Sequence, residues 1–256
     1  MSSFPKHFYW GAATSAHQVE GGMRNDWTGW EKENANRLAE RAKQKVFPDY
    51  ILKNYSSPFA EKNYISGKAC DHYHCYEEDF DIAKSLGHNT HRFSIEWSRI
   101  EPEEGKFDEK EIEHYRQVIA ALRARGMEPF VTLWHWTLPL WVRDKGGVLA
   151  KDFPRWFERY VRRMAEEFKN GVKFWITTNE PEIYALNSYY RGLWPPQKRG
   201  LTSFFRVTYA LNLAHQRAYR TLKNASVGAQ VGVAVNQSYF ESAGGIVNNM
   251  LKWGAD

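Results

Sequence analysis

The chain has little of what marks several large classes of protein. Its 256 residues include only 2 cysteines, Cys70 and Cys75, which are too few for a disulfide framework, so we expect a reducing, cytoplasmic setting. No apolar run approaches the ~20 residues that a membrane helix needs, and residues 1–16 lack the basic start and apolar stretch of a signal peptide. With 43% hydrophobic and 25% charged residues, the composition is typical of a globular protein. We therefore predict a globular protein with no membrane partner.

Charge of one sign does not dominate either. The chain has 35 Lys and Arg against 30 Asp and Glu, a formal net charge of +5. The charges alternate in sign along residues 33–45 and 155–169, as they do on solvated helix faces, and the sequence contains no nucleic-acid reader motif. We therefore predict no nucleic-acid partner. Aromatic residues are abundant at 16%, with 11 Trp, and flat apolar rings suit a site for sugars or other planar ligands, although most belong to the core.

Short β-rich runs alternate with longer segments of helical periodicity. Strands are predicted at 8–13, 90–95, 129–134, 174–178 and 231–235, and helices at 76–86, 108–122, 152–168 and 203–223. The clearest helix begins at Asp108 and Glu111, which have capping-box spacing. Strands that alternate with helices are parallel, either in a doubly wound sheet or in a (β/α) barrel. The strand-to-helix junctions lack a GxGxxG or Walker loop, which favours the barrel.

The spacing of the strands predicts an incomplete barrel. Four intervals of about 55 residues each separate the five strands, so eight units would need roughly 440 residues. The predicted fold class is α/β, a partial (β/α)8 TIM barrel with about the first four βα units plus strand five. We expect a single domain over 1–256, with a loop and helical insertion at 34–66. Because such a sheet is open, the lumen side chains, assigned here to Phe93, Val131 and Ile176, are expected to face water.

Polar side chains lie in or directly after all five predicted strands. The carboxyl ends of barrel strands carry the catalytic groups, so this pattern predicts an active site rather than separate structural roles. The residues are Gln18, Arg92, His135, Trp136, Asn179, Glu180 and Asn236.

The sequence around these positions resembles the family-1 glycoside hydrolases, which include β-glucosidases and β-galactosidases. The resemblance covers nearly all of the chain, but only the N-terminal part of the family's domain, ending after the fifth strand. The matching segments, in order, are Phe8-Tyr-Trp-Gly-Ala-Ala-Thr-Ser-Ala-His-Gln-Val-Glu-Gly21, Cys70-Asp-His-Tyr-His74, Arg92-Phe-Ser-Ile-Glu-Trp-Ser-Arg-Ile100, His135-Trp-Thr-Leu-Pro139 and Thr178-Asn-Glu-Pro181.

The resemblance implies three catalytic residues. Glu180 matches the general acid/base, which protonates the leaving oxygen and then deprotonates water. Asn179 matches the residue that hydrogen-bonds the sugar 2-OH, and Arg92 matches the arginine that keeps the nucleophilic carboxylate charged.

The resemblance also implies a sugar-binding set and no cofactor or metal. Gln18 and His135 match contacts to the glycone hydroxyls, and Trp136 occupies the position of an aromatic residue that lines the sugar pocket. Asn236 resembles the asparagine that ends the family's fifth strand. The expected ligand is a β-glycoside or a related sugar.

The nucleophile has no counterpart in this chain. In the family it is a glutamate in an Ile/Val-Thr-Glu-Asn-Gly motif on strand seven, and that motif does not occur here. A retaining mechanism needs two carboxyl groups about 5–5.5 Å apart. The other candidate acids, Glu20, Glu96 and Glu182, are expected to be surface or loop carboxylates or to pair with nearby arginines. The isolated chain is therefore expected to be weak or inactive as a hydrolase.

Three alternatives follow for what the chain does and binds. Hydrolysis could require a complementing C-terminal half, or the chain could form a homo-oligomer, most simply a dimer, across its open edges. A non-catalytic sugar-binding or self-associating half-barrel module would use the same residues. Zinc binding at Cys70–Cys75 is disfavoured, because ligands this close in sequence strain a single tetrahedral site.

Overall fold

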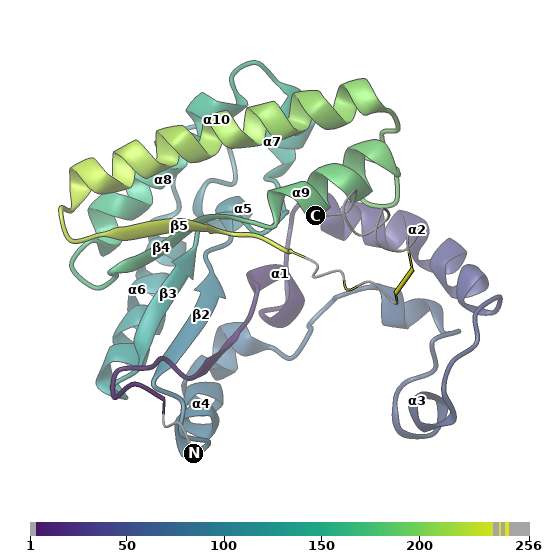
Figure 1. Ribbon diagram of the computed structural model, residues 1–256, viewed down its shortest axis with the longest axis horizontal. Coiled ribbons are helices and arrows are strands. Elements are labelled where there is room, and N and C mark those ends of the chain that lie inside the picture. Colours follow the sequence, from purple (N-terminus) through teal and green to yellow (C-terminus); the bar gives the residue numbers. More distant parts are fainter. Residues whose placement is uncertain (1–3, 238–240, 242–243, 246–256) are drawn as a thin grey trace.

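A computed structural model describes residues 4–237, 241 and 244–245 of the chain (Figure 1). Five strands form one sheet in the order β1-β2-β3-β4-β5, and every neighbouring pair is parallel. All five predicted strands are present, each shifted or shortened by a few residues. They are β1 (Gly11–Ala13), β2 (Thr90–Ser94), β3 (Glu128–Thr132), β4 (Phe174–Asn179) and β5 (Gln230–Ala234).

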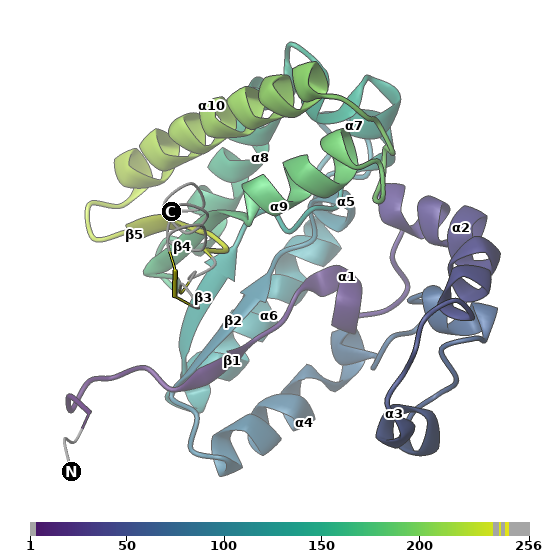
Figure 2. The same ribbon diagram turned by 45° about the vertical axis from the view of Figure 1, so that its right-hand side comes forward.

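Four long helices connect the strands and cover one side of the sheet (Figures 1 and 2). They are α4 (His72–Ser85), α6 (Glu109–Ala124), α8 (Phe153–Phe168) and α10 (Leu201–Ala225), which confirms the four predicted helices. In the described part of the chain no helix is long and apolar enough to cross a membrane.

Shorter elements and one further long helix lie around the carboxyl ends of the strands and beside them (Figure 2). Residues 34–66 contain the later turns of α2 and two short elements that follow it. The full set is α1 (Ala16–Val19), α2 (Asp26–Ala42), α3 (Asp49–Asn54), η1 (Glu61–Tyr64), α5 (Trp97–Ile100), α7 (Leu140–Asp144), η2 (Gly147–Leu149), α9 (Pro181–Ala185) and η3 (Leu186–Tyr190).

The first turn of α6 is capped by the side chain that precedes it. Asp108 accepts hydrogen bonds from the backbone N–H groups of Lys110 and Glu111, at 2.9 and 3.4 Å. Glu111 does not complete the capping box, because its carboxylate instead interacts with Tyr73 and Arg99. The first turn of α6 is therefore capped by Asp108 alone.

The core lies between the sheet and the four long helices. The apolar side of α8 is buried at Phe157, Tyr160, Val161, Met164 and Phe168, while Trp156 stays half-exposed. Trp97, from the short helix after β2, stacks on Tyr160 at 5.2 Å with a 19° interplanar angle. Burial of these large side chains holds α8 against the end of β2.

The structure corrects the prediction of which residues lie on the open face of the sheet. Phe93 and Val131 were expected to face water, but both are buried in the core beneath the helices. This assignment was wrong: successive side chains of a strand point to opposite faces, and these two belong to the face that the helices cover. The open face instead carries Arg92 and the stacked rings of Phe130 and Phe174, whose centroids are 4.2 Å apart. These three side chains remain partly exposed.

Among the residues that the structure describes, the sheet ends in two edge strands, β1 and β5, each paired on one side only. All three residues of β1 are exposed, and Gly232 in β5 is exposed as well. Five parallel strands in sequential order that alternate with helices confirm the predicted α/β class. The open edges leave unpaired N–H and C=O groups of the kind that recruit another strand.

The cap of α6 can be tested directly. We expect Asp108→Ala to lower the free energy of unfolding by about 1 kcal/mol, because two backbone N–H groups lose their acceptor. Urea unfolding followed by far-UV circular dichroism measures this loss. Lys110→Ala, an exposed change in the same turn, is the control. Equal stability of the two variants would contradict the capping role.

Candidate functional site

Arg92 lies on the open face of the sheet and joins β2 to the adjacent strand β3 and to the end of β4. Its Nε donates to Thr132 Oγ1 in β3 at 2.9 Å, and its guanidinium also donates to Asn179 Oδ1 at the end of β4 at 2.5 Å. Burial lowers the pKa of Arg92, and the charge of Glu180 opposes this effect. The arginine therefore fixes the Asn179 side chain in position and lies within electrostatic reach of Glu180.

Asn179 connects the arginine to the loop after β3. Its Nδ2 lies 3.3 Å from His135 Nε2, and its backbone carbonyl accepts a hydrogen bond from the Trp136 indole N–H at 2.9 Å. Residues from three strand ends thus form one connected group. Of the residues predicted from the sequence, Arg92, His135, Trp136 and Asn179 belong to it.

His135 is held in its neutral form. Burial and the nearby charge of Arg92 lower the pKa of its imidazole to about 4. A neutral ring can accept the Asn179 amide hydrogen at Nε2 and then carries its own hydrogen on Nδ1. Nδ1 is buried without a hydrogen-bond partner among the described residues. The site therefore contains one polar ring atom that the protein leaves unsatisfied.

Glu180 and Trp136 both adopt backbone conformations that non-glycine residues rarely use. Their φ angles are 42° and 78°, in the left-handed region. The backbone N–H of Glu180 donates to the carbonyl of Ala234 in β5 at 2.7 Å, which holds the strained turn against the neighbouring strand. Strain of this kind persists where the surroundings enforce it, and it clusters at functional sites.

The two remaining predicted residues lie at opposite sides of this group. Gln18 is exposed on α1 and lines a pocket of about 140 Å³ together with His135 and Trp136. Asn236 is exposed after β5, and its backbone N–H donates to Glu182 in the first turn of α9 at 2.6 Å. The structure therefore brings Gln18 to the pocket and ties Asn236 to α9.

The aromatic side of the pocket was not predicted. Trp27 of α2 lies against Trp136 with ring centroids 6.2 Å apart and an interplanar angle of 21°, and Trp194 contacts both rings at 5.4 and 4.7 Å. The high tryptophan content was the only sequence signal for this cluster, because the three residues are far apart in the chain.

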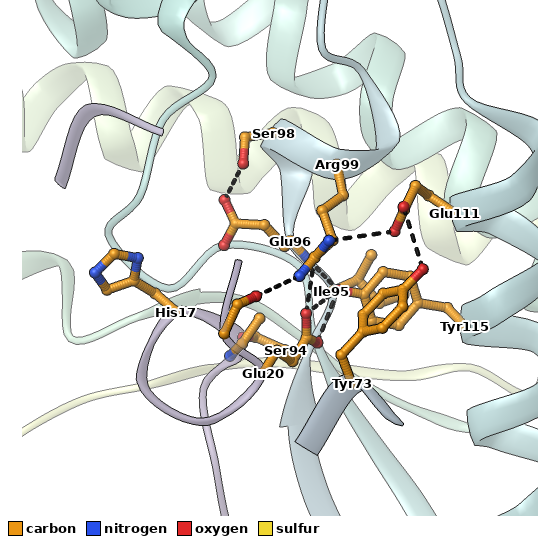
Figure 3. A network of polar contacts seen from close by, with 12 residues as sticks. His17, Glu20, Tyr73, Ser94, Ile95, Glu96, Ser98, Arg99, Glu111 and Tyr115 are labelled. Carbon is orange, nitrogen blue, oxygen red and sulfur yellow. Dashed lines mark hydrogen bonds and ion pairs between the residues drawn. The ribbon is translucent and has the colours of Figure 1, made fainter. Parts of the chain in front are cut away.

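A buried polar network lies behind the pocket (Figure 3). Glu20 accepts from Arg99 Nε at 3.0 Å and from the Tyr115 hydroxyl at 2.9 Å. Burial raises the pKa of Glu20 to about 7, although Arg99 and Tyr115 oppose the shift. The expected pairing of an acid with Arg99 is present at Glu20.

Glu96 corrects another expectation. It was expected to be a surface or loop carboxylate or an arginine partner, but it is only 2% exposed. Its oxygens accept hydrogen bonds from Ser98, Thr137 and Asn25 at 2.6, 2.9 and 3.3 Å. Side chains from β3's loop and from the start of α2 thus meet at this carboxylate.

The Cys70–Cys75 segment does not form a ligand cluster. His72 and His74 each pair with a different aspartate, Asp79 and Asp71. Within the residues that the structure describes, no three His, Cys, Asp or Glu side chains are placed to hold a metal ion.

Comparison with known proteins identifies the family. The model of the family described as Glycosyl hydrolase family 1 matches residues 1–251. The chain is 34% identical to beta-glucosidase A of Thermotoga maritima over 95% of this chain and 51% of that protein. The family 1 b-glucosidase structure from Thermotoga maritima superposes with a TM-score of 0.82 at 32% identity, and covers 98% of this chain and 53% of that one. A beta-glycosidase structure from Pyrococcus horikoshii superposes with a TM-score of 0.79 at 34% identity, and the match covers 99% of this chain and 54% of that one.

The chain belongs to glycosyl hydrolase family 1. It spans about half the length of the curated relatives it matches, and it aligns with the first half of the family's barrel. The family membership and the N-terminal position predicted from the motifs are therefore confirmed.

The other candidate nucleophiles of this half-barrel already accept hydrogen bonds from other groups of the protein. Glu20 is bound to Arg99 and Tyr115, Glu96 accepts three side-chain donors, and Glu182 accepts from the Asn236 backbone. Each of these contacts occupies lone pairs that an attacking nucleophile would need free.

Asp26, at the start of α2, provides a pH-dependent test of how this helix is attached. Its Oδ1 accepts from the Leu138 N–H at 2.7 Å, and burial raises the pKa of Asp26 to about 7. In the unfolded chain the Asp26 carboxyl ionises at about pH 4, whereas in the folded chain it stays protonated up to about pH 7. Between these pH values the unfolded state is ionised and the folded state is not, so the free energy of unfolding falls as pH rises. We expect Asp26→Asn to remove this dependence, a difference on the order of 3 kcal/mol between pH 4 and pH 8.

Urea unfolding of Asp26→Asn and of the unmodified chain at several pH values measures this difference. Glu33→Gln, an exposed change on the same helix, should retain the original pH dependence. An unchanged pH dependence in Asp26→Asn would show that Asp26 is not the group responsible.

Proposed function

We propose that this chain supplies the acid/base and glycone-binding half of a retaining β-glycosidase, and that hydrolysis requires a second polypeptide segment that completes the barrel. The observation that carries the proposal is the connected group of Arg92, Asn179 and His135 beside the strained Glu180. Its position at the carboxyl ends of β2, β3 and β4 matches the catalytic face of such barrels. The missing segment would provide the nucleophilic carboxylate.

Each residue has a defined step in the proposed reaction. Glu180 donates its proton to the glycosidic oxygen as the bond from that oxygen to the anomeric carbon breaks, while the nucleophile bonds to the same carbon. Glu180 then accepts a proton from water as water displaces the nucleophile. Asn179 hydrogen-bonds the sugar 2-OH, and this contact strengthens in the oxocarbenium-like transition state. Arg92 keeps the incoming carboxylate charged.

The substrate class follows from the relatives and from the pocket. The curated relatives include proteins named beta-glucosidase and 1,4-beta-D-glucan glucohydrolase, and Thermotoga maritima beta-glucosidase has been solved in complex with glucoimidazole and with deoxynojirimycin. In this chain, Gln18, His135 and Trp136 combine polar groups with an aromatic face, the combination that a pyranose ring requires. We propose a β-glucoside-like ligand, with Gln18 and His135 on its hydroxyls. Asn236, which follows β5, is proposed to bind the same ligand from the rim of the site.

A non-catalytic sugar-binding module is the second candidate. It is favoured by one observation: the pocket beside Gln18 already combines polar and aromatic side chains, whereas the family's nucleophile motif does not occur in the sequence. Binding of a glucoside without turnover, both alone and with a completing segment, would support this module over the glycosidase.

The acid/base role can be tested with a completing fragment. The C-terminal half of Thermotoga maritima beta-glucosidase A is the natural complement, because the chain covers only 51% of that protein. With an aryl β-glucoside, we expect turnover by the mixture and little by either part. Glu180→Ala should reduce turnover about 10²–10⁴-fold, because proton transfer is lost, and azide should restore it by replacing water as the attacking species.

Glu182→Ala, two residues further along, is the matched control and should retain activity within a few-fold. Full activity in Glu180→Ala would overturn the assignment. Turnover by the chain alone that Glu180→Ala abolishes would overturn the requirement for a second segment.

The open edges support a second expectation, self-association in the absence of a complement. Tyr9 and Trp10, which precede β1, are 45% and 48% exposed, and β1 and β5 have one unpaired side each. Light scattering after gel filtration should give the mass of a dimer for the chain alone and of a one-to-one complex with the fragment. A monomer under both conditions would contradict pairing through these edges.

A further inference from the structure

We propose that Trp27 and Glu31 of α2 are sugar-contacting residues of the pocket beside Gln18, and that Glu31 makes this pocket select uncharged, hydroxyl-bearing pyranosides over uronates. This proposal rests on the sugar-binding function proposed above and adds two residues and a substrate preference to it. It concerns the part of the pocket that lies on α2, where Trp27 packs against Trp136 of the connected group around Arg92.

The position of α2 is fixed by a reciprocal pair of hydrogen bonds to the loop after β3. Leu138 N donates to Asp26 Oδ1 at 2.7 Å, and Asp26 N donates to the Leu138 carbonyl at 3.1 Å. Trp27 and Glu31 are four residues apart and therefore share one face of the helix. Both line the same pocket as Gln18 and His135.

Trp27 provides an apolar wall. Its ring is only partly buried and lies nearly parallel to Trp136, with Trp194 against both. The C–H groups of a pyranose pack well on such aromatic faces, whereas its hydroxyls need polar partners at the ring edge. Gln18, which is exposed at the pocket, offers an amide that can both donate and accept.

Glu31 provides an acceptor that the protein only partly occupies. Oε1 accepts from the Ser66 hydroxyl and lies 2.8 Å from His17 Nε2, and Oε2 accepts from the Ser66 N–H at 2.9 Å. A carboxylate has about four acceptor sites, so one remains for a ligand hydroxyl. Burial raises the pKa of Glu31, but hydrogen bonds from His17 and Ser66 outweigh it and hold the pKa below its ordinary value.

The chemistry of this acceptor defines the preferred ligand. A sugar hydroxyl has a hydrogen to donate to Glu31. A uronate carboxylate has none at neutral pH, and it would bring a second negative charge to the same small pocket. His17 lines the same pocket and pairs with Glu31, and although burial lowers the pKa of its imidazole, this pairing raises it above the ordinary value. Its ring nitrogens are already engaged, with Nδ1 3.1 Å from the Asn25 amide nitrogen and Nε2 beside Glu31 and Ser66, so they leave no free donor for a uronate carboxylate.

Titration calorimetry of the purified chain with methyl β-glucoside and methyl β-glucuronide tests the proposal. We expect the unmodified chain to bind the glucoside at least tenfold more tightly than the glucuronide. Glu31→Gln should weaken glucoside binding about fivefold or more, and it should reduce the ratio of glucoside affinity to glucuronide affinity. Trp27→Leu should weaken glucoside binding about tenfold through loss of the aromatic face.

The same helix supplies a matched control. Glu33→Gln alters an exposed glutamate that lines a different pocket, and it should retain the original affinities. Glu31→Asp, which keeps the charge but shortens the side chain, is a second test of the contact if Glu31→Gln unfolds. Circular dichroism confirms that each variant is folded.

The outcomes separate this inference from the function on which it rests. If Gln18→Ala weakens glucoside binding but Trp27→Leu and Glu31→Gln do not, the α2 contacts are overturned and the sugar pocket stands. An unchanged glucoside-to-glucuronide ratio in folded Glu31→Gln overturns the selectivity. If the unmodified chain binds neither sugar, the sugar-binding function fails and this inference fails with it.

Discussion

The site depends on one charged side chain placed on the open face of a parallel sheet. Arg92 donates to Thr132 in β3 and to Asn179 at the end of β4, so a single guanidinium ties three strands together where their carboxyl ends meet. Asn179 in turn reaches His135 and accepts from Trp136. A partly buried cation is costly unless its donors are satisfied, and one of the two side chains that satisfy Arg92 is Asn179, the residue proposed to bind the sugar 2-OH. The requirement to solvate Arg92 therefore also orders the site.

A second constraint joins the peripheral helix to this framework. The α2 helix has few contacts with the sheet of its own, and its attachment depends on Asp26 pairing with the Leu138 backbone and on Asn25 reaching His17 and Glu96. These contacts bring residues 25–31 against the loop after β3 although more than 100 residues separate them in the chain. The pocket wall is thus a tertiary feature that no local motif encodes.

This difference explains what could be predicted from the sequence. The strands and long helices follow from local periodicity and from caps such as Asp108. Gly87 follows the end of α4 with a φ of 86°, a conformation that glycine adopts readily. The strand-end residues Arg92, His135, Trp136 and Asn179 were found because parallel topology places such ends together. The face of Phe93 and Val131 was misassigned because a short apolar strand does not show which side is covered. Glu96 was misjudged because its partners, Asn25 and Thr137, come from distant segments.

The sequential strand order has a consequence for how the molecule is made. Each strand pairs with the strand before it and the strand after it, so no pairing has to wait for a distant part of the chain. During synthesis, which proceeds from the N-terminus, the sheet can add one βα unit at a time, and each new edge serves as the template for the next strand. Until the next strand pairs with it, the same edge exposes unpaired N–H and C=O groups that can pair with another chain. Ribosome-bound chains of this protein should therefore be most prone to misassociation just after β3 or β4 has emerged and before its covering helix has docked.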